Sequence, residues 1–332
     1  MKAIRTHEVG GPETLTLDEI DVPTPGKGEV LVAVKACAIN YPDTLMIRDL
    51  YQFKPERPYS PGGELAGVVE AVGEGVENYK VGDRVMAGMG NGGLREKAIV
   101  PANRMFPVPD GVPFEKAASL LMTYGTTIHG LKDRGHIKEG DVVLVLGAAG
   151  GVGLSAVELA KAFGARVVAA VSSEAKGEVA RKAGADDVVI YPRAEMDKAA
   201  SKELANAFKA ACGPNGADIV YDIVGGQYSE PALRSIAWEG RFLVVGFPAG
   251  IAKMPLNLTL LKSCDICGVF WGAFTAREPA KFVAQVKELF QLMQDGKIDP
   301  LVSETFPLER AGDAIAKLEN REAVGKLVVT MD

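Results

Sequence analysis

One segment constrains the fold of this chain more than any other. Residues 141–165, DVVLVLGAAGGVGLSAVELAKAFGA, place an apolar run, a glycine-rich turn and a helix-like run in succession. Against the dinucleotide-binding pattern Gly-x-Gly-x-x-Gly, alanine replaces the first glycine, while Gly150 and Gly153 keep the other two. We expect Gly150 to let backbone approach a pyrophosphate and Gly153 to allow close helix–strand packing, with the helix N-terminus facing the anion. A tight turn without a ligand would use the same residues.

The region around this turn has the rhythm of repeated βαβ units. Helix-like segments separate a series of apolar runs: VVLVLG, ARVVAAV, DDVVIY, ADIVYDIV and RFLVVGF. Strands that are apolar throughout are typical of a parallel sheet with helices on both faces. The sequence therefore predicts an α/β fold with a doubly wound parallel sheet, whose last strand is CDICGVFWG at Cys264–Gly272.

The first 124 residues follow a different pattern. Short β-rich runs alternate there with Pro and Gly punctuation, which predicts a twisted, partly open β-barrel-like unit. Beyond the last apolar strand we expect helices around Ala280–Gln294 and Arg310–Glu319 and a closing strand at Lys326–Thr330. These segments are assigned to the N-terminal unit, giving domains of residues 1–124 with 272–332 and of residues 125–271.

Composition restricts the class of protein. A chain of 332 residues has room for about two domains, and its net charge of −6 provides no basic field for nucleic acid. The four cysteines show no disulfide spacing, and no apolar run has the length of a signal peptide core or a membrane span. We therefore expect a cytoplasmic protein that engages neither membranes nor nucleic acid.

The tip of the second strand of the parallel sheet bears on the choice of dinucleotide. NAD-binding proteins place a carboxylate there for the ribose 2′-hydroxyl, but this strand ends in Val171, Ser172 and Ser173. The serines, together with Lys176 and Tyr191, could bind a ribose phosphate, which favours NADPH as cofactor. Glu174 is contrary evidence if its side chain reaches the ribose, and Lys176 could equally be an exposed helix lysine.

At this point the chain resembles the zinc-free quinone oxidoreductase family of the medium-chain dehydrogenase/reductase superfamily, and most closely its branch called quinone oxidoreductase-like protein 2. The resemblance implies a GroES-like β-rich catalytic domain and a Rossmann NADPH-binding domain. Matching motifs cover nearly the whole chain: AINYPD at Ala38–Asp43, PGGELAG at Pro61–Gly67, GDRV at Gly82–Val85, TYGTT at Thr123–Thr127, AAGGVG at Ala148–Gly153, GAD at Gly184–Asp186 and GKLVV at Gly325–Val329.

The zinc ligands of related alcohol dehydrogenases are missing from these motifs. Asn40 stands where a cysteine would be, and Gly63 precedes Glu64 where a histidine would be. This set cannot complete a tetrahedral zinc site, so we expect no metal. Without a Lewis acid, the acceptors that remain reasonable are quinones and α,β-unsaturated carbonyls, which take up hydride readily. Cys264 and Cys267 are interpreted as buried small residues rather than ligands.

The resemblance also implies functional positions. Asn40 and Thr126 are expected near the nicotinamide, and Arg321 near the 2′-phosphate. Around the rest of the cofactor the implied residues are Ala149, Gly150, Gly151, Val152, Gly246, Phe247, Phe270 and Trp271. Plain alternatives exist: Asn40 and Thr126 could cap helices, and Arg321 could be a solvated charge. The three histidines fall in no matched catalytic motif and are interpreted as structural or surface residues.

Tyr51 is the candidate for contact with the acceptor. In the family a tyrosine near this position faces substrate, and its phenol could donate a proton to the developing enolate or hydroquinone oxygen. It could instead be only an aromatic wall. Asp49 stands where the family often has glycine, which puts the position of Tyr51 in question. Further pocket candidates, which could equally be core residues, are Tyr41, Met122, Trp271 and Phe274.

The sequence thus favours an NADPH-dependent reductase of quinones or enones, with Tyr51 and Asn40 as catalytic candidates. Two alternatives stay open: a 2-enoyl-CoA reductase, and a non-catalytic protein that senses NADPH or binds RNA, as zeta-crystallin relatives do. The resemblance further implies a homodimer in which the edge strand Cys264–Trp271 pairs with its symmetry mate.

Overall fold

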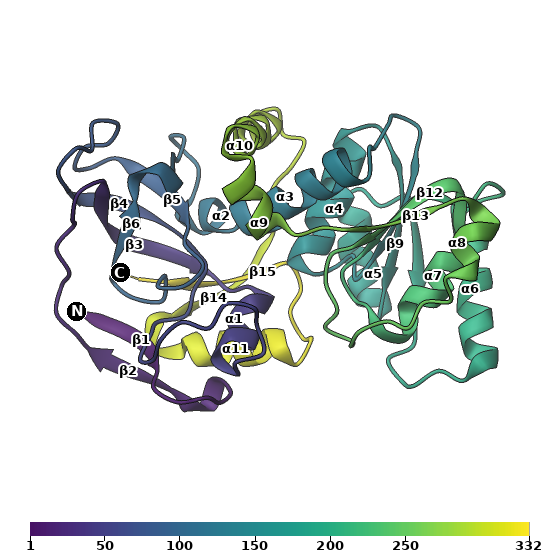
Figure 1. The fold of residues 1–332 in the computed structure, drawn as a ribbon, viewed down its shortest axis with the longest axis horizontal. Coiled ribbons are helices and arrows are strands. Elements are labelled where there is room, and N and C mark those ends of the chain that lie inside the picture. The colour runs from purple at the N-terminus through teal and green to yellow at the C-terminus, as the bar shows by residue number, and fades with distance from the viewer. Residues whose placement is uncertain (332) are drawn as a thin grey trace. The chain divides into compact units, whose positions relative to one another are not determined.

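The glycine-rich turn belongs to a six-stranded parallel sheet in the computed structural model, which describes residues 1–331 (Figure 1). The spatial order is β10-β9-β8-β11-β12-β13. The strands are β8 (Val142–Leu146), β9 (Arg166–Val171), β10 (Asp187–Ile190), β11 (Ala217–Asp222), β12 (Ile236–Val244) and β13 (Asp265–Gly268). Chain order reverses between β8 and β11, and in doubly wound sheets ligands bind at the carboxyl ends beside that point. The predicted parallel sheet is confirmed.

Helices cover both faces of this sheet (Figure 1). They are α4 (Gly151–Ala162), α5 (Glu174–Lys182), α6 (Lys198–Cys212), α7 (Ser229–Arg234) and α8 (Asn257–Lys262). The strands are apolar on both sides for this reason: Leu144, Val168 and Phe242 have exposed fractions of 1% or less. The order also leaves β13 as an edge strand.

The second compact unit of the chain, residues 123–299, contains this sheet and two further helices. These are α9 (Trp271–Arg277) and α10 (Pro279–Gln294), which pack on the π-helix His129–Arg134 that continues α3 (Leu121–Ile128). Both helices were assigned from the sequence to the N-terminal domain. The structure places them in the other unit, where Asp133 binds Lys281 and Gln285 of α10.

The first unit comprises residues 1–122 and the chain from Pro300 onward, and is built on a seven-stranded sheet. Its order is β14-β15-β3-β4-β5-β7, with β6 also paired to β3. The strands are β3 (Glu29–Ala38), β4 (Glu64–Val72), β5 (Arg84–Gly88), β6 (Lys97–Pro101), β7 (Met105–Pro107), β14 (Val302–Pro307) and β15 (Lys326–Thr330). Because β15 runs antiparallel to β3, the expectation that the C-terminal strand rejoins the N-terminal unit is confirmed.

Short elements complete this unit. A two-stranded sheet joins β1 (Lys2–Thr6) to β2 (Leu15–Glu19), and the helices are α1 (Tyr41–Ile47), α2 (Phe114–Ala118) and α11 (Ala311–Glu319). The core lies between the sheet and these helices, with Val32, Leu65 and Ile315 fully buried. Within residues 1–331, no helix has the length and apolar character needed to cross a membrane; α10, the longest, has 16 residues.

Candidate functional site

In the turn after β8, close packing alone requires one of the glycines. Gly147 turns the chain with a φ of 73°, and Gly150 is the N-cap of α4. A Cβ at Gly153 would lie 2.1 Å from the carbonyl oxygen of Gly147 and 2.7 Å from Cα of Ala148. Backbone atoms cannot withdraw as a flexible side chain can, so only glycine lets α4 pack this closely on β8, as the sequence predicts.

Packing gives no such reason for the glycine at position 150. Its φ of −79° and ψ of 171° suit any residue, and an added Cβ would come no closer than 3.6 Å to the Gly147 carbonyl oxygen. The open space borders the first N–H groups of α4, where helices bind phosphate. We call the space that a Cβ at Gly150 would fill the cradle. It fits the diphosphate of a dinucleotide. The remaining turn residues of the predicted site are buried Ala149 and the half-buried Gly151 and Val152.

The tip of β9 carries no free carboxylate. Ser173 is the N-cap of α5, and its Oγ accepts the Lys176 N–H at 3.3 Å. The carboxylate of Glu174, the contrary evidence in the sequence, accepts a hydrogen bond from Arg181 Nη1 at 2.9 Å. Since Arg181 lies seven residues further along α5, this bond directs Glu174 along its own helix. The observation favours a site for a phosphorylated ribose rather than a free ribose.

A second cation stands beside this tip. Arg193 follows β10 and donates from Nε to Ser172 Oγ at 3.4 Å. Burial lowers the pKa of Lys176, and the positive charge of Arg193 lowers it further. Tyr191, in contrast, is largely a core residue, with its ring 4.5 Å from that of Tyr228. Arg193 was not predicted from the sequence: it is the third residue after β10, and an arginine in such a position has no signature until its neighbours are known.

Other predicted cofactor residues follow strands β12 and β13. Phe247 and Phe270 are about half exposed, and a Cβ at Gly246 would meet nothing closer than 3.4 Å. Trp271 begins α9, and Phe274 is buried within it. Thr126 lies inside α3 rather than before it, so the alternative that it caps this helix is wrong.

The first unit buries a polar network at Asn40, the N-cap of α1. Asn40 Nδ2 donates to the Ala38 carbonyl at 3.2 Å and to Glu64 Oε1 at 2.9 Å, while Lys326 Nζ donates to Asn40 Oδ1 at 2.7 Å. Lys326 Nζ also lies 3.1 Å from Glu64 Oε1, with 5% and 2% of the two side chains exposed. Both amide hydrogens of Asn40 are therefore engaged, and Oδ1 keeps one lone pair for a ligand. Lys326 was missed because the motif GKLVV gives no sign of where its lysine points.

Asp43 is buried at the same helix start. Its Oδ2 accepts the Asn40 N–H at 2.8 Å and its Oδ1 accepts the Gly62 N–H at 3.0 Å. Burial raises its pKa to about 6, against these two hydrogen bonds and the charge of Lys326. Asn40 thus occupies the N-cap position of α1, but its side chain binds Glu64 and Lys326 rather than a helix N–H.

These residues do not fit a zinc ion. Glu64 Oε1 accepts from Asn40 and Lys326, and its Oε2 accepts the Met122 N–H at 2.9 Å. The donor set offers neither thiolate nor imidazole, and an ammonium already neutralises the one carboxylate. Within residues 1–331, no group of three His, Cys, Asp or Glu side chains is arranged to hold a metal.

Tyr51 follows a turn made by Asp49. Asp49 adopts a φ of 55°, the left-handed region that favours glycine, and its Oδ1 accepts from Arg57 Nη2 at 2.8 Å. Aspartate thus makes the turn that glycine often makes in the family. The Tyr51 ring lies 6.0 Å from that of Phe53, and burial raises the pKa of its hydroxyl. The hydroxyl is protonated at neutral pH and hydrogen-bonds to none of the described residues.

The other candidates of the first unit lie around α1 and α11. Tyr41 is the first residue of α1, and burial raises the pKa of its hydroxyl while the charge of nearby Arg321 opposes the rise. Arg321 follows α11 with a left-handed φ of 60°, and it is exposed. Met122 is held through its N–H by Glu64. Within their own unit, Tyr41 and Arg321 are therefore neighbours.

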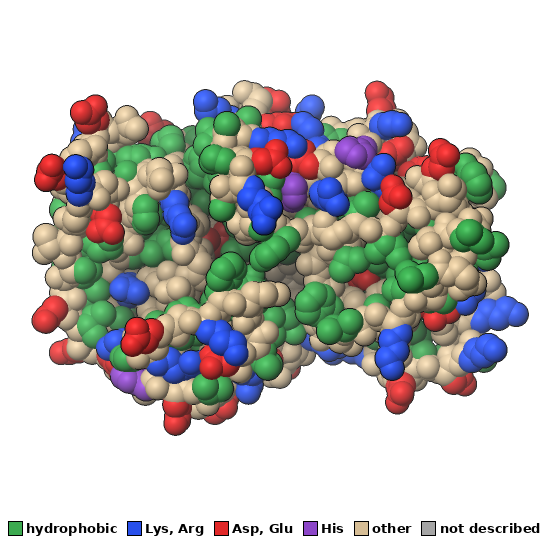
Figure 2. All heavy atoms as spheres, in the orientation of Figure 1, with side chains coloured by type: hydrophobic (Ala, Val, Ile, Leu, Met, Phe, Trp, Pro, Cys, Tyr) green, Lys and Arg blue, Asp and Glu red, His purple; other side chains and the backbone are tan. Residues whose placement is uncertain are grey.

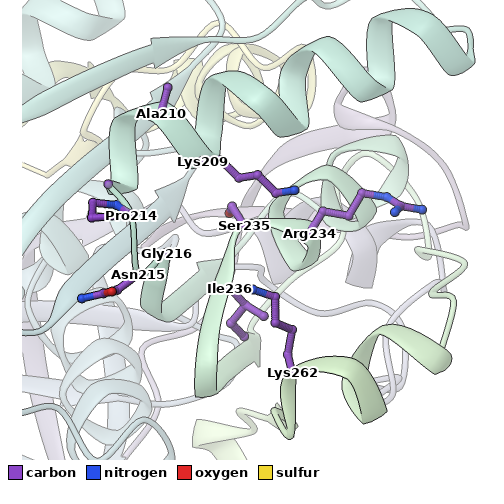
Figure 3. A pocket seen from close by; sticks show the side chains of 10 residues that line it. Lys209, Ala210, Pro214, Asn215, Gly216, Arg234, Ser235, Ile236 and Lys262 are labelled. Atoms are coloured by element: carbon purple, nitrogen blue, oxygen red, sulfur yellow. The ribbon is translucent and has the colours of Figure 1, made fainter.

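A separate hollow of about 600 Å³ lies at the amino ends of β11 and β12 (Figure 3). Three cations line it: Lys209, Arg234 and Lys262. Each lies in the last turn of its own helix, where it stabilises the C-terminal carbonyl groups, and Arg234 also binds Glu230. Helix termini therefore account for its basic lining.

Known proteins resemble the chain over its full length. Residues 26–110 match the alcohol dehydrogenase GroES-like domain, and residues 151–293 match the zinc-binding dehydrogenase family. Quinone oxidoreductase-like protein 2 of Rattus norvegicus is 36% identical, over 96% of this chain and 89% of that protein. Quinone oxidoreductase of Homo sapiens is 30% identical, over 100% and 98%.

Solved structures of similar proteins also match this chain over its full length. Escherichia coli quinone oxidoreductase complexed with NADPH is 30% identical with a TM-score of 0.90, and mycobacterial Rv1454c complexed with NADPH is 34% identical with a TM-score of 0.91. Each alignment covers 100% of both chains. With its GroES-like N-terminal domain and Rossmann sheet, the chain belongs to the quinone oxidoreductase family of the medium-chain dehydrogenase/reductase superfamily.

Proposed function

We propose that this chain is an NADPH-dependent reductase that delivers hydride to quinones or α,β-unsaturated carbonyl compounds. The observation that carries the proposal is the cradle at Gly150, where packing leaves room for a side chain that the sequence omits. A diphosphate placed there would accept from the first N–H groups of α4 and gain from the helix dipole. The relatives crystallised with NADPH lend further support.

The preference for NADPH over NADH rests on charge at the tips of β9 and β10. Arg193 donates to Ser172 Oγ and its positive charge also acts on the Lys176 ammonium, so two cations lie close to these tips, while Arg181 holds the Glu174 carboxylate. A ribose 2′-phosphate would gain charge-assisted hydrogen bonds there, whereas a free 2′-hydroxyl would lack an acceptor carboxylate. By family resemblance Arg321 is a further contact of this phosphate.

Bound there, NADPH would supply a hydride from C4 of its nicotinamide to an acceptor carbon, an acceptor oxygen would gain a proton, and NADP⁺ would be the product. The chain's own part is to orient and to supply the proton. Lys326 and Glu64 fix the amide of Asn40 so that one lone pair of Oδ1 stays available to the nicotinamide side of the reaction. Tyr51 keeps its phenolic proton at neutral pH and donates it to the acceptor oxygen. Because the residues around Asn40 and Glu64 do not fit zinc, the acceptor must be electron-poor in its own right.

An acceptor panel tests this function. Purified protein treated with EDTA is mixed with NADPH and, in separate reactions, 1,4-benzoquinone, methyl vinyl ketone and crotonyl-CoA. We expect NADPH absorbance to fall with the quinone or the enone. Preference for crotonyl-CoA would select the enoyl-thioester alternative, and no acceptor above background would refute the proposal.

The visible face intersperses charges of both signs rather than forming one basic field, which disfavours the RNA-binding alternative (Figure 2).

The proposal includes a homodimer through β13. This edge strand and α8 expose apolar side chains that water disfavours: Leu256, Leu260, Leu261 and Ile266. Pairing two β13 strands about a two-fold axis would satisfy the open edge and cover these groups. Light scattering at micromolar concentration should give twice the chain mass, and Leu260→Lys should shift it toward the monomer. A wild-type monomer would refute the dimer without bearing on the chemistry.

A further inference from the structure

Three residues of one helical segment, Gly125, His129 and Asp133, recur at intervals of four. Gly125 lies in α3, and the other two lie in the π-helix that continues it. A four-residue interval is close to one turn in both helix types, so these residues share a face. We call them the 125–133 stripe. Each of them contacts α9 or α10.

The first contact is between helix backbone and an indole. A Cβ at Gly125 would lie 2.8 Å from Nε1 of Trp271 and 3.0 Å from its Cε2. The indole therefore rests directly on α3, with the ring of Phe282 edge-on at 5.6 Å. Trp271 Nε1 is buried and hydrogen-bonds to none of the described residues. Packing alone, rather than a polar bond, fixes this side chain.

The second contact is a ring stack. His129 is 7% exposed, and its ring lies 4.0 Å from that of Phe274 with the planes inclined by 16°. His129 Nδ1 lies 2.7 Å from Asp133 Oδ2, so its N–H donates to that carboxylate and fixes the plane of the ring. The orientation of Phe274 thus depends on Asp133 through His129.

The third contact anchors α10. Asp133 Oδ1 lies 2.8 Å from Lys281 Nζ, and Asp133 Oδ2 accepts from Gln285 Nε2 at 2.8 Å. Burial alone would raise the pKa of Asp133, but hydrogen bonds from Lys281, His129 and Gln285 outweigh it and hold the pKa below its usual value. The carboxylate is therefore charged at neutral pH, and it links His129, which stacks on Phe274, to Lys281 and Gln285 of α10.

A nearby ion pair shows what distinguishes Asp133. Lys132 Nζ lies 2.8 Å from Glu288, and it joins the same π-helix to the same α10. Its side chains are 41% and 36% exposed, whereas that of Asp133 is 13% exposed. Exposed pairs contribute little to structure, while losing one partner of a buried group costs much more. The two pairs are thus a matched comparison.

We propose that Asp133 and His129 are positioning residues of the acceptor site: they fix α9 and α10, and with them the aromatic side chains of Trp271 and Phe274. The inference rests on the proposed function and on the sequence-based expectation that Trp271 and Phe274 belong to the acceptor pocket. Neither positioning residue touches a reacting atom. A planar aromatic acceptor depends on such side chains more than a small enone does, because stacking needs correctly placed rings.

The first readout is structural and needs no activity. The chain has two tryptophans, and Trp238→Phe removes the exposed one so that Trp271 alone fluoresces. In this background Asp133→Ala should shift Trp271 emission to longer wavelength and increase its quenching by acrylamide. Lys132→Met should leave both unchanged. If Asp133→Ala does not fold, Asp133→Asn, which keeps the shape and removes the charge, provides the same test. A folded Asp133 variant with wild-type Trp271 fluorescence would overturn the inference.

The second readout separates positioning from general damage. Asp133→Ala and His129→Leu should raise KM for 1,4-naphthoquinone by about three- to tenfold, the scale of a lost aromatic contact. They should leave KM for methyl vinyl ketone and Kd for NADPH within about twofold. Equal losses for both acceptors, or altered fluorescence with no change in KM, would refute the role in the acceptor site. A wild-type protein that reduces neither acceptor would refute the proposed function, while the fluorescence result would still decide whether Asp133 holds α9.

Discussion

Two neighbouring glycines should respond oppositely to the same added methyl group. At Gly153 a Cβ would stand 2.1 Å from the Gly147 carbonyl oxygen, well inside contact distance of backbone that is fixed by β8. We expect Gly153→Ala to lower the free energy of unfolding by about 1–3 kcal/mol, as overpacking does. At Gly150 the nearest atom is 3.6 Å away and the dihedral angles suit alanine. Gly150→Ala should therefore change the stability by less than about 1 kcal/mol, because the lower chain entropy of unfolded alanine and its poorer fit at a helix N-cap oppose each other.

The effect of Gly150→Ala should appear in NADPH binding rather than in stability. The methyl group of Gly150→Ala occupies the space proposed for the diphosphate, so NADPH affinity should fall at least about tenfold, or about 1.4 kcal/mol. The assay pairs denaturant unfolding with calorimetric titration of NADPH for the wild type and both variants. Gly150→Ala that is stable and binds NADPH like the wild type would refute the reasoning, because the open space would then have no ligand.

Three further changes test separate parts of the site. Lys176→Ala should weaken NADPH about ten- to a hundredfold and leave NADH unchanged in the same titration, since it removes a charge-assisted bond to the 2′-phosphate; equal losses would contradict this. For Asp43, a folded-state pKa of about 6 against an ordinary 3.8 means that the native state binds its proton more tightly, so stability should fall by about 2 kcal/mol as pH rises from 4 to 7. Urea unfolding should lose that part of its pH dependence in Asp43→Asn, and an unchanged slope would count against it. Lys326→Met should cost about 3–5 kcal/mol by stranding the Glu64 charge, and the double variant Lys326→Met/Glu64→Gln should recover part of it; full additivity in thermal unfolding would exclude the coupling.

The sequence predicted what depends on local pattern. Apolar runs without alternation identify strands covered on both faces, and the Rossmann sheet has the predicted strands, although the last of them ends at Gly268 and Trp271 already begins α9. The glycine pattern locates the turn, and the structure gives Gly153 the packing role expected for it. The C-terminal strand was also correctly returned to the N-terminal unit, where the structure pairs it with β3.

What the sequence could not give is the partner of each polar side chain. Glu174 was ambiguous because only structure shows that Arg181 binds it. Lys326 and Arg193 were missed because a lysine in a strand, or an arginine after one, has no signature until its neighbours are known. The segment 272–299 was assigned to the wrong unit because an amphipathic helix reveals its apolar face and not the surface it packs on. Asp133 binds Lys281 and Gln285, which lie more than 140 residues further along the chain, and these contacts attach the segment to the second unit.

The central claim is that the chain passes a hydride from NADPH directly to an electron-poor acceptor. The most direct test uses NADPH deuterated at C4 with methyl vinyl ketone, and mass spectrometry of the butanone formed by the EDTA-treated protein. The account predicts one deuterium on the β-carbon of the product when the label is on the transferred face. Turnover that leaves the product unlabelled from both C4 positions, or that stops when metal is removed, would contradict it.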